Sequence, residues 1–117
     1  MQTSESLDKF APAFVKAQNA VKSALKTSTN PHFRSKYADL SEVWSACREA
    51  LAGNGIGVVQ SPGGDGVTVT MTTRLLHTSG QWVEGTMGVK PSKTDPQGCG
   101  SAVTYTRRYA LAAMVGV

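Results

Sequence analysis

The sequence contains few of the residues that build disulfide frameworks, metal centres or membrane segments. Its two cysteines, Cys47 and Cys99, fit neither a disulfide framework nor the four-ligand spacing of a zinc site. Its two histidines, His32 and His77, lack a histidine one helical turn away and a nearby cysteine pair. There is no signal peptide and no apolar run of membrane length. These absences predict a soluble, intracellular protein with reduced thiols and with no metal ion or cofactor.

Enzyme signatures are missing as well. The glycine-rich stretch SPGGDG at residues 61–66 lacks the Lys-Ser/Thr pair of a phosphate-binding nucleotide loop and falls between two predicted strands. The sequence also has no paired carboxylates and no nucleophile elbow. A hairpin turn accounts for the glycines, and we expect a protein that is not an enzyme and does not hydrolyse ATP.

The composition that is present is that of a globular domain. Of 117 residues, 40% are hydrophobic and 17% charged, which predicts a single domain over residues 1–117 with a real core. The net charge of +4, from 12 basic and eight acidic residues, permits an anionic partner without requiring one. Residues 110–117 carry no charge and no evident cap. We therefore expect the N-terminal part of a longer protein.

Apolar residues recur every three or four positions in two N-terminal segments, which predicts two helices. In the first helix, over residues 8–26, Asp8 is the expected N-cap, and Pro12 falls in the first turn, where its missing N–H costs no intrahelical bond. Its apolar stripe is Leu7, Phe10, Phe14, Ala17, Val21 and Leu25. The second helix opens on a capping box of Asp39 and Glu42 and ends before Gly53. Its expected inward residues are Leu40, Val43, Trp44, Cys47 and Leu51.

After the second helix, hydrophobic residues recur at every second position. Residues 56–60, 67–76 and 81–89 predict three strands, and their links are too short for crossovers, so an antiparallel meander is expected. The middle strand alternates apolar residues with a hydroxyl-rich face. A final helix runs to the end of the chain. The predicted fold is α+β, a three-stranded antiparallel meander with helices packed on one face.

The final helix is polar in its first half and apolar in its second. Gly98 and Gly100 are expected to leave backbone N–H groups free near its start, where the helix dipole favours an anion. At about 100° per residue, one arc carries Ser101, Thr104, Tyr105, Arg107 and Arg108. The opposite arc carries Ala102, Val103, Thr106, Tyr109, Ala110, Ala113 and Met114, and the second half of the helix is expected to be enclosed. The guanidinium group of arginine matches the geometry of phosphate oxygens, and a tyrosine ring can stack on a nucleic-acid base. These arginines could instead pair with carboxylates or stack on aromatic residues of the core.

Two stretches of the sequence mix basic and aromatic residues: NPHFRSKYADLSEVW at residues 30–44 and GSAVTYTRRYAL at residues 100–111. Together they resemble the ERF family of phage-type single-strand annealing proteins. IGVVQ and LLHTSGQWVEG, which lie between them, are also similar, so the likeness covers nearly the whole chain. The resemblance implies a protein that binds single-stranded DNA and anneals complementary strands without ATP during homologous recombination. It also implies homo-oligomeric rings or helical arcs and a core like that of the annealing-ring recombinases.

The resemblance further implies which residues bind DNA and which partners are involved. Arg107 and Arg108 would hold phosphates, and Tyr105 would stack on the strand or position it. The other implied DNA-binding residues are Thr104, Ser101, Arg34, Lys36, Tyr37, Lys90 and Lys93. Tyr109 is assigned to the core. The implied partners, in a bacterial host cytoplasm and away from membranes, are single-stranded DNA, further copies of the chain, and a phage exonuclease or host single-strand-binding protein.

Two other functions stay open. A double-stranded RNA-binding module has the same order of helix, three strands and helix, with basic residues near the start of its last helix. Against it, the usual lysine cluster is absent and an extra leading helix is present. A non-catalytic interaction domain, with arginines serving an interface between subunits, is the second alternative.

Overall fold

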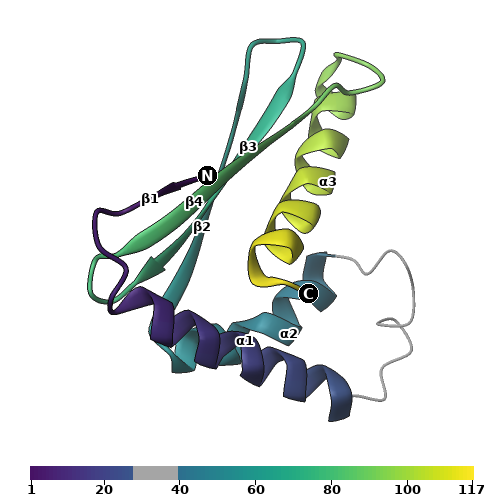
Figure 1. Ribbon diagram of the computed structural model, residues 1–117. Helices are drawn as coiled ribbons and strands as arrows, with labels where there is room; N and C mark the ends of the chain where they lie inside the picture. Colours follow the sequence, from purple (N-terminus) through teal and green to yellow (C-terminus); the bar gives the residue numbers. More distant parts are fainter. Residues whose placement is uncertain (28–39) are drawn as a thin grey trace.

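A computed structural model describes residues 1–27 and 40–117 and has the predicted order of two helices, three main strands and a helix (Figure 1). A further short strand precedes the first helix. The elements are β1 (Gln2–Thr3), α1 (Phe10–Thr27), α2 (Leu40–Gly53), β2 (Ile56–Gly64), β3 (Val69–His77), β4 (Trp82–Val89) and α3 (Pro96–Val115). The α+β fold class is therefore confirmed.

The strands form one antiparallel sheet in the order β1-β4-β3-β2. The predicted meander is confirmed and is widened by β1, which pairs with β4 through Gln2↔Glu84 and Thr3↔Val83. The first main strand continues past its predicted end to Gly64. Pro62 is tolerated there because β2 is an edge strand and needs no outward N–H donor.

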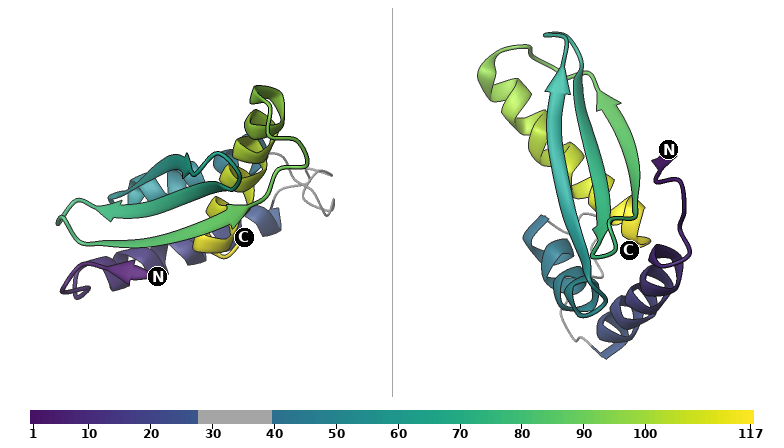
Figure 2. Two further views of the ribbon diagram at one scale, coloured as in Figure 1. Left: turned by 90° about the horizontal axis from the view of Figure 1, so that it is seen from above. Right: turned by 90° about the vertical axis from the view of Figure 1, so that its left-hand side faces the viewer.

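α3 lies along one face of the sheet, whereas α1 and α2 lie across one end of it (Figures 1 and 2). In the right-hand view of Figure 2 the sheet stands in front of α3. The alternation predicted for the middle strand is confirmed, since its buried residues, Val69, Met71, Thr73 and Leu75, all point to one face. Thr70, Thr72 and Arg74 are half-buried on the opposite face, and Leu76 is exposed there.

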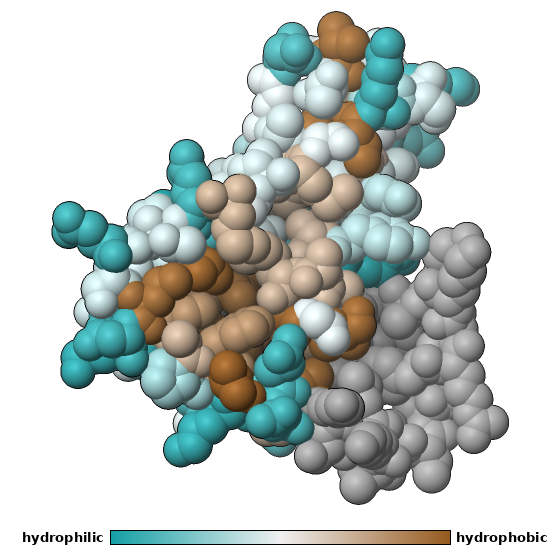
Figure 3. Space-filling view, in the orientation of Figure 1, coloured by the Kyte–Doolittle hydropathy of each residue, from teal (hydrophilic) through white to brown (hydrophobic). Residues whose placement is uncertain are grey.

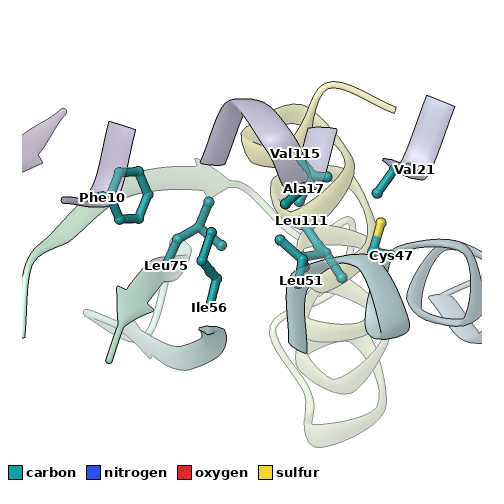
Figure 4. Close-up of a cluster of buried hydrophobic side chains, with 9 residues drawn as sticks. All are labelled: Phe10, Ala17, Val21, Cys47, Leu51, Ile56, Leu75, Leu111 and Val115. Carbon is teal, nitrogen blue, oxygen red and sulfur yellow. The ribbon is translucent and has the colours of Figure 1, made fainter. Parts of the chain in front are cut away.

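The main core lies where the three helices meet the end of the sheet (Figure 4). Its nine buried residues come from α1, α2, β2, β3 and α3, and they are Phe10, Ala17, Val21, Cys47, Leu51, Ile56, Leu75, Leu111 and Val115. Burial raises the pKa of the Cys47 thiol to about 11, so it stays protonated at neutral pH and packs as a small apolar group. On the face seen in Figure 3, hydrophobic residues gather in the angle between the strands and α1, with hydrophilic residues around the outer edge.

The start of α1 corrects the predicted N-cap. The backbone N–H groups of Lys9 and Phe10 both donate to Gln81 Oε1, at 2.9 and 2.8 Å, rather than to the carboxylate of Asp8. Asp8 instead accepts a hydrogen bond from Gln81 Nε2 at 2.7 Å, and this bond is the main cause that lowers the pKa of Asp8. A glutamine from the turn before β4 therefore anchors the first helix to the sheet.

Both ends of α3 are capped, which corrects the expectation that the chain's last helix lacks a cap. Asp95 is the N-cap, and Gly116 is the C-cap in the left-handed region, with φ of 84°. The Gly116 N–H donates to the Ala112 carbonyl at 2.9 Å, and Gln18 Nε2 donates to the Val115 carbonyl at 3.1 Å. The end of α3 is therefore held both by its own turn and by α1.

Candidate nucleic-acid interface

The loop before α3 fixes the position of its first turn. Asp95 Oδ1 accepts the Gly98 N–H at 2.7 Å, and Pro96 occupies the first turn, where no intrahelical donor is needed. Any side chain at Gly98 would collide with the carbonyl oxygen of Lys93, so this close approach requires glycine. The expectation of a free Gly98 N–H for an anion is wrong, because the carboxylate of Asp95 already occupies it.

The two predicted arcs of α3 are largely present. Ser101, Thr104, Tyr105 and Arg107 are exposed and Arg108 is half-buried. The buried residues of the helix are Ala102, Thr106, Ala110, Leu111 and Val115. The assignment of Tyr109 to the core is wrong, because Tyr109 is only half-buried. The Tyr109 ring instead contacts the Tyr105 ring, with ring centroids 4.4 Å apart and ring planes tilted by 36°. On the same arc Ala113 is exposed, and Val103 and Met114 are half-buried.

Arg108 belongs to a column of contacting side chains on the polar side of α3. Its guanidinium carbon lies 5.1 Å from the centre of the Tyr109 ring, which itself contacts the ring of Tyr105. A surface hollow of about 550 Å³ beside this column is lined by Gln97, Gly100, Ser101, Thr104, Tyr105 and Arg108. Within the described chain, Arg108 Nε is buried and has no hydrogen-bond partner. A buried donor without a partner costs free energy.

Lys93 extends this polar surface toward the start of α3. It lines a smaller hollow of about 270 Å³, and both hollows share Gln97 and Ser101. We call Lys93, Ser101, Thr104, Tyr105 and Arg108 the front strip. Lys90 is exposed just after β4 and lines neither hollow.

Arg107 faces another side of α3. It lines a groove between α3, α2 and the sheet together with Trp44, and its backbone carbonyl accepts a hydrogen bond from Gln60 Nε2 at 3.0 Å. Successive helix residues are rotated by about 100°, which places neighbouring arginines over two different hollows. The single arc expected from the sequence is therefore divided between the front strip and this groove.

The charges of the two arginines are not neutralised by carboxylates within the part of the chain that the structure describes. The ion pair found there joins Arg74 Nε to Glu84 Oε1 at 2.9 Å on the opposite face of the sheet, where Arg74 also lies 3.8 Å above the Trp82 ring. Pairing of Arg107 and Arg108 with carboxylates is not seen among these residues, whereas Arg108 does contact an aromatic ring. Both guanidinium groups can thus offer charged donors to an anion.

Several predicted residues fall elsewhere or were missed. Arg34, Lys36 and Tyr37 lie outside the described residues. Trp44 was expected to point inward, but it is 37% exposed because the groove opens beside it. Tyr109 was also missed as a candidate, although its spacing of four residues from Tyr105 indicates neighbours on one helix face.

In a comparison with known protein families, the model of the ERF superfamily matches residues 10–117 of the chain. No curated protein and no solved structure matches the chain. Among the described helices, none combines the length and the hydropathy needed to cross a membrane.

Proposed function

Because the chain belongs to the ERF superfamily, we propose that it binds single-stranded DNA and anneals complementary strands without ATP during homologous recombination. Membership of this family points to annealing in recombination, and the match extends over residues 10–117. Family membership supports a role in strand annealing, and the surface of α3 offers groups that could bind the DNA backbone. No covalent bond is made or broken in this proposal, because base pairing between the two strands supplies the free energy of annealing.

The observation that carries the proposal is the pair of arginines on α3 that have no carboxylate partner among the described residues. Arg107 is exposed, and Arg108 lines a hollow that also carries hydroxyl groups; its Nε–H is buried and has no acceptor in the described part of the chain. A phosphate has several acceptor oxygens and a negative charge, so it satisfies both needs of a guanidinium group. Ser101 offers a further hydroxyl donor within the same hollow, whereas the Thr104 hydroxyl already donates to the Gly100 carbonyl at 3.2 Å.

Annealing then follows from charge neutralisation. Two DNA strands repel each other, and guanidinium groups that replace condensed counterions reduce this repulsion. Tyr105 is 44% exposed and gives a ring on which the strand can stack without regard to sequence. Contacts to the backbone leave most base edges free to test a second strand.

Self-association is a further part of the proposal. One chain offers only a few phosphate contacts, which bind weakly at physiological salt. Repetition of the same surface around a ring or helical arc makes later contacts intramolecular and raises the overall affinity. The same logic predicts that binding weakens steeply as salt increases.

Annealing of two complementary oligonucleotides labelled with a fluorophore and a quencher tests this function. We expect the chain to accelerate pairing above the spontaneous rate, equally with and without ATP, and to lose this effect at high salt. Unlabelled duplex RNA serves as the control competitor, and it should compete less well than single-stranded DNA. No acceleration at any protein concentration, or a requirement for ATP, would contradict the proposal, and stronger competition by duplex RNA would favour an RNA-binding module.

A further inference from the structure

The groove beside Arg107 has properties that binding of phosphates alone does not use. Its volume is about 600 Å³, within the range of about 300–1,000 Å³ typical of sites for small ligands. It is lined by Ser41, Trp44, Val58, Gln60, Pro62, Met71, Val103, Arg107 and Leu111. Met71 and Leu111 are almost completely buried, so they form an apolar floor. We call this site the Trp44 groove.

Trp44 gives the groove an aromatic wall that is open to a ligand. The indole is 37% exposed, whereas Cys47 and Leu51 on the same helix are buried. A large aromatic ring that stays partly in water gains free energy when a flat apolar partner covers it. The walls contributed by Val58 and Val103 are also apolar, so the groove favours a flat group over a charged one.

Arg107 and Gln60 add polar groups to this apolar site. Arg107 is exposed and, among the described residues, has no carboxylate partner. Gln60 Nε2 donates to Thr73 Oγ1 and to the Arg107 carbonyl, both at 3.0 Å, which fixes the amide between β2 and α3. Both N–H donors of this amide are used in these bonds, so Gln60 can contact a ligand only through its amide oxygen, which accepts a hydrogen bond.

We infer that the Trp44 groove holds one unpaired base of the bound DNA strand. The base stacks on the indole of Trp44, Gln60 Oε1 accepts from an exocyclic amino group, and Arg107 binds the adjacent phosphate. This inference rests on the proposed function and adds a source of selectivity for single strands. A paired base cannot leave its stack to enter the groove without breaking its pair, so duplexes are excluded. The charge of Arg107 favours a nucleotide over an apolar peptide side chain as the occupant.

Fluorescence of Trp44 reports directly on this contact. The protein has two tryptophans, so Trp82→Phe leaves Trp44 as the single indole. We expect an oligodeoxycytidylate to quench its emission, whereas a base-free strand of the same length binds more weakly and leaves the emission unchanged. Trp44→Leu should weaken binding of the oligonucleotide roughly 5- to 150-fold, the range for loss of one base–aromatic stack. Trp82→Leu is the matched control, because Trp82 lies against Arg74 and outside the groove, and its affinity should not change.

The outcomes separate this inference from the proposed function. If the oligonucleotide binds, as measured by fluorescence anisotropy, but Trp44 emission does not respond, the inference is wrong and strand binding stands. If Trp44 emission changes with the concentration of the protein and not with the concentration of DNA, a second copy of the chain occupies the groove and the inference is again wrong. If no strand binds, the proposed function itself fails. The single-tryptophan titration uses a protein with its groove intact, so it decides the matter even if Trp44→Leu does not fold.

Discussion

Replacing both Arg107 and Arg108 by alanine is expected to abolish annealing and to lower the affinity for single-stranded DNA at least about 100-fold. A hydrogen bond to a charged group contributes about 1.5–3 kcal/mol, and two such groups are lost from each subunit. The slope of log affinity against log salt should also fall, by about 0.7 for each phosphate contact removed. Anisotropy titrations at several salt concentrations measure both effects.

The fold should survive this double substitution. Arg107 is exposed, and the hydrogen bond that it receives from Gln60 goes to its backbone carbonyl, which alanine keeps. Arg108 is half-buried and loses its contact with Tyr109, a cation–π interaction of about 0.5–2 kcal/mol. Alanine also has the highest helix propensity, which offsets part of that loss.

A matched control separates specific contacts from net charge. Lys9→Ala with Lys16→Ala also removes two positive charges, from exposed positions before and within α1. Its affinity should fall far less than that of the arginine pair. An arginine variant that is folded by circular dichroism and binds normally would show that the site is placed wrongly, and an unfolded variant would show that the arginines are structural.

The second large effect is on stability and concerns two neighbouring leucines of β3. Leu75 is fully buried in the main core, whereas Leu76 is 39% exposed on the opposite face of the sheet. Leu75→Ala should lower the free energy of unfolding by about 2–5 kcal/mol, because it removes buried methyl groups and leaves a cavity. Leu76→Ala should cost about 1 kcal/mol or less, as expected for a change at the surface. Urea denaturation measures both values.

The comparison of these leucines tests which face of the sheet is covered. Successive strand residues point to opposite faces, so a register shifted by one residue would exchange the two results. An equal loss of stability in both variants would mean that both faces are buried, for example by contact between subunits. A larger loss from Leu76→Ala would contradict the packing of α3 and the main core against the Leu75 face.

Much of the fold could be predicted because its signals are local. The alternation in β3 and the spacing of apolar residues in α1 and α2 depend only on neighbours in the chain. Two features could not be found in this way. β1 has only two residues and pairs with β4 far along the chain, and the cap of α1 comes from Gln81, 71 residues after Phe10. Contacts between residues so far apart in the chain produce no periodic pattern of residue types in the sequence.

The candidate site was predictable to a similar degree. Helical geometry places the side chains of Ser101, Thr104 and Arg108 on one side of α3, as observed. It does not reveal which neighbouring elements flank that side, and this is why Arg107 lies in a separate groove. Trp44 was assigned to the core because an apolar stripe gives the direction of a side chain but not how far its neighbours cover it.

Contact between the α3 guanidinium groups and DNA phosphates is measured most directly by a thermodynamic cycle in which the protein and the DNA strand are each changed. The affinities of the wild-type chain and of Arg107→Ala/Arg108→Ala are compared for a natural strand and for one whose phosphates are replaced by neutral methylphosphonates. We predict that neutralising the strand weakens the wild type strongly and the variant much less, which gives a large coupling energy. An equal loss of affinity in both proteins would show that these arginines do not touch the phosphates.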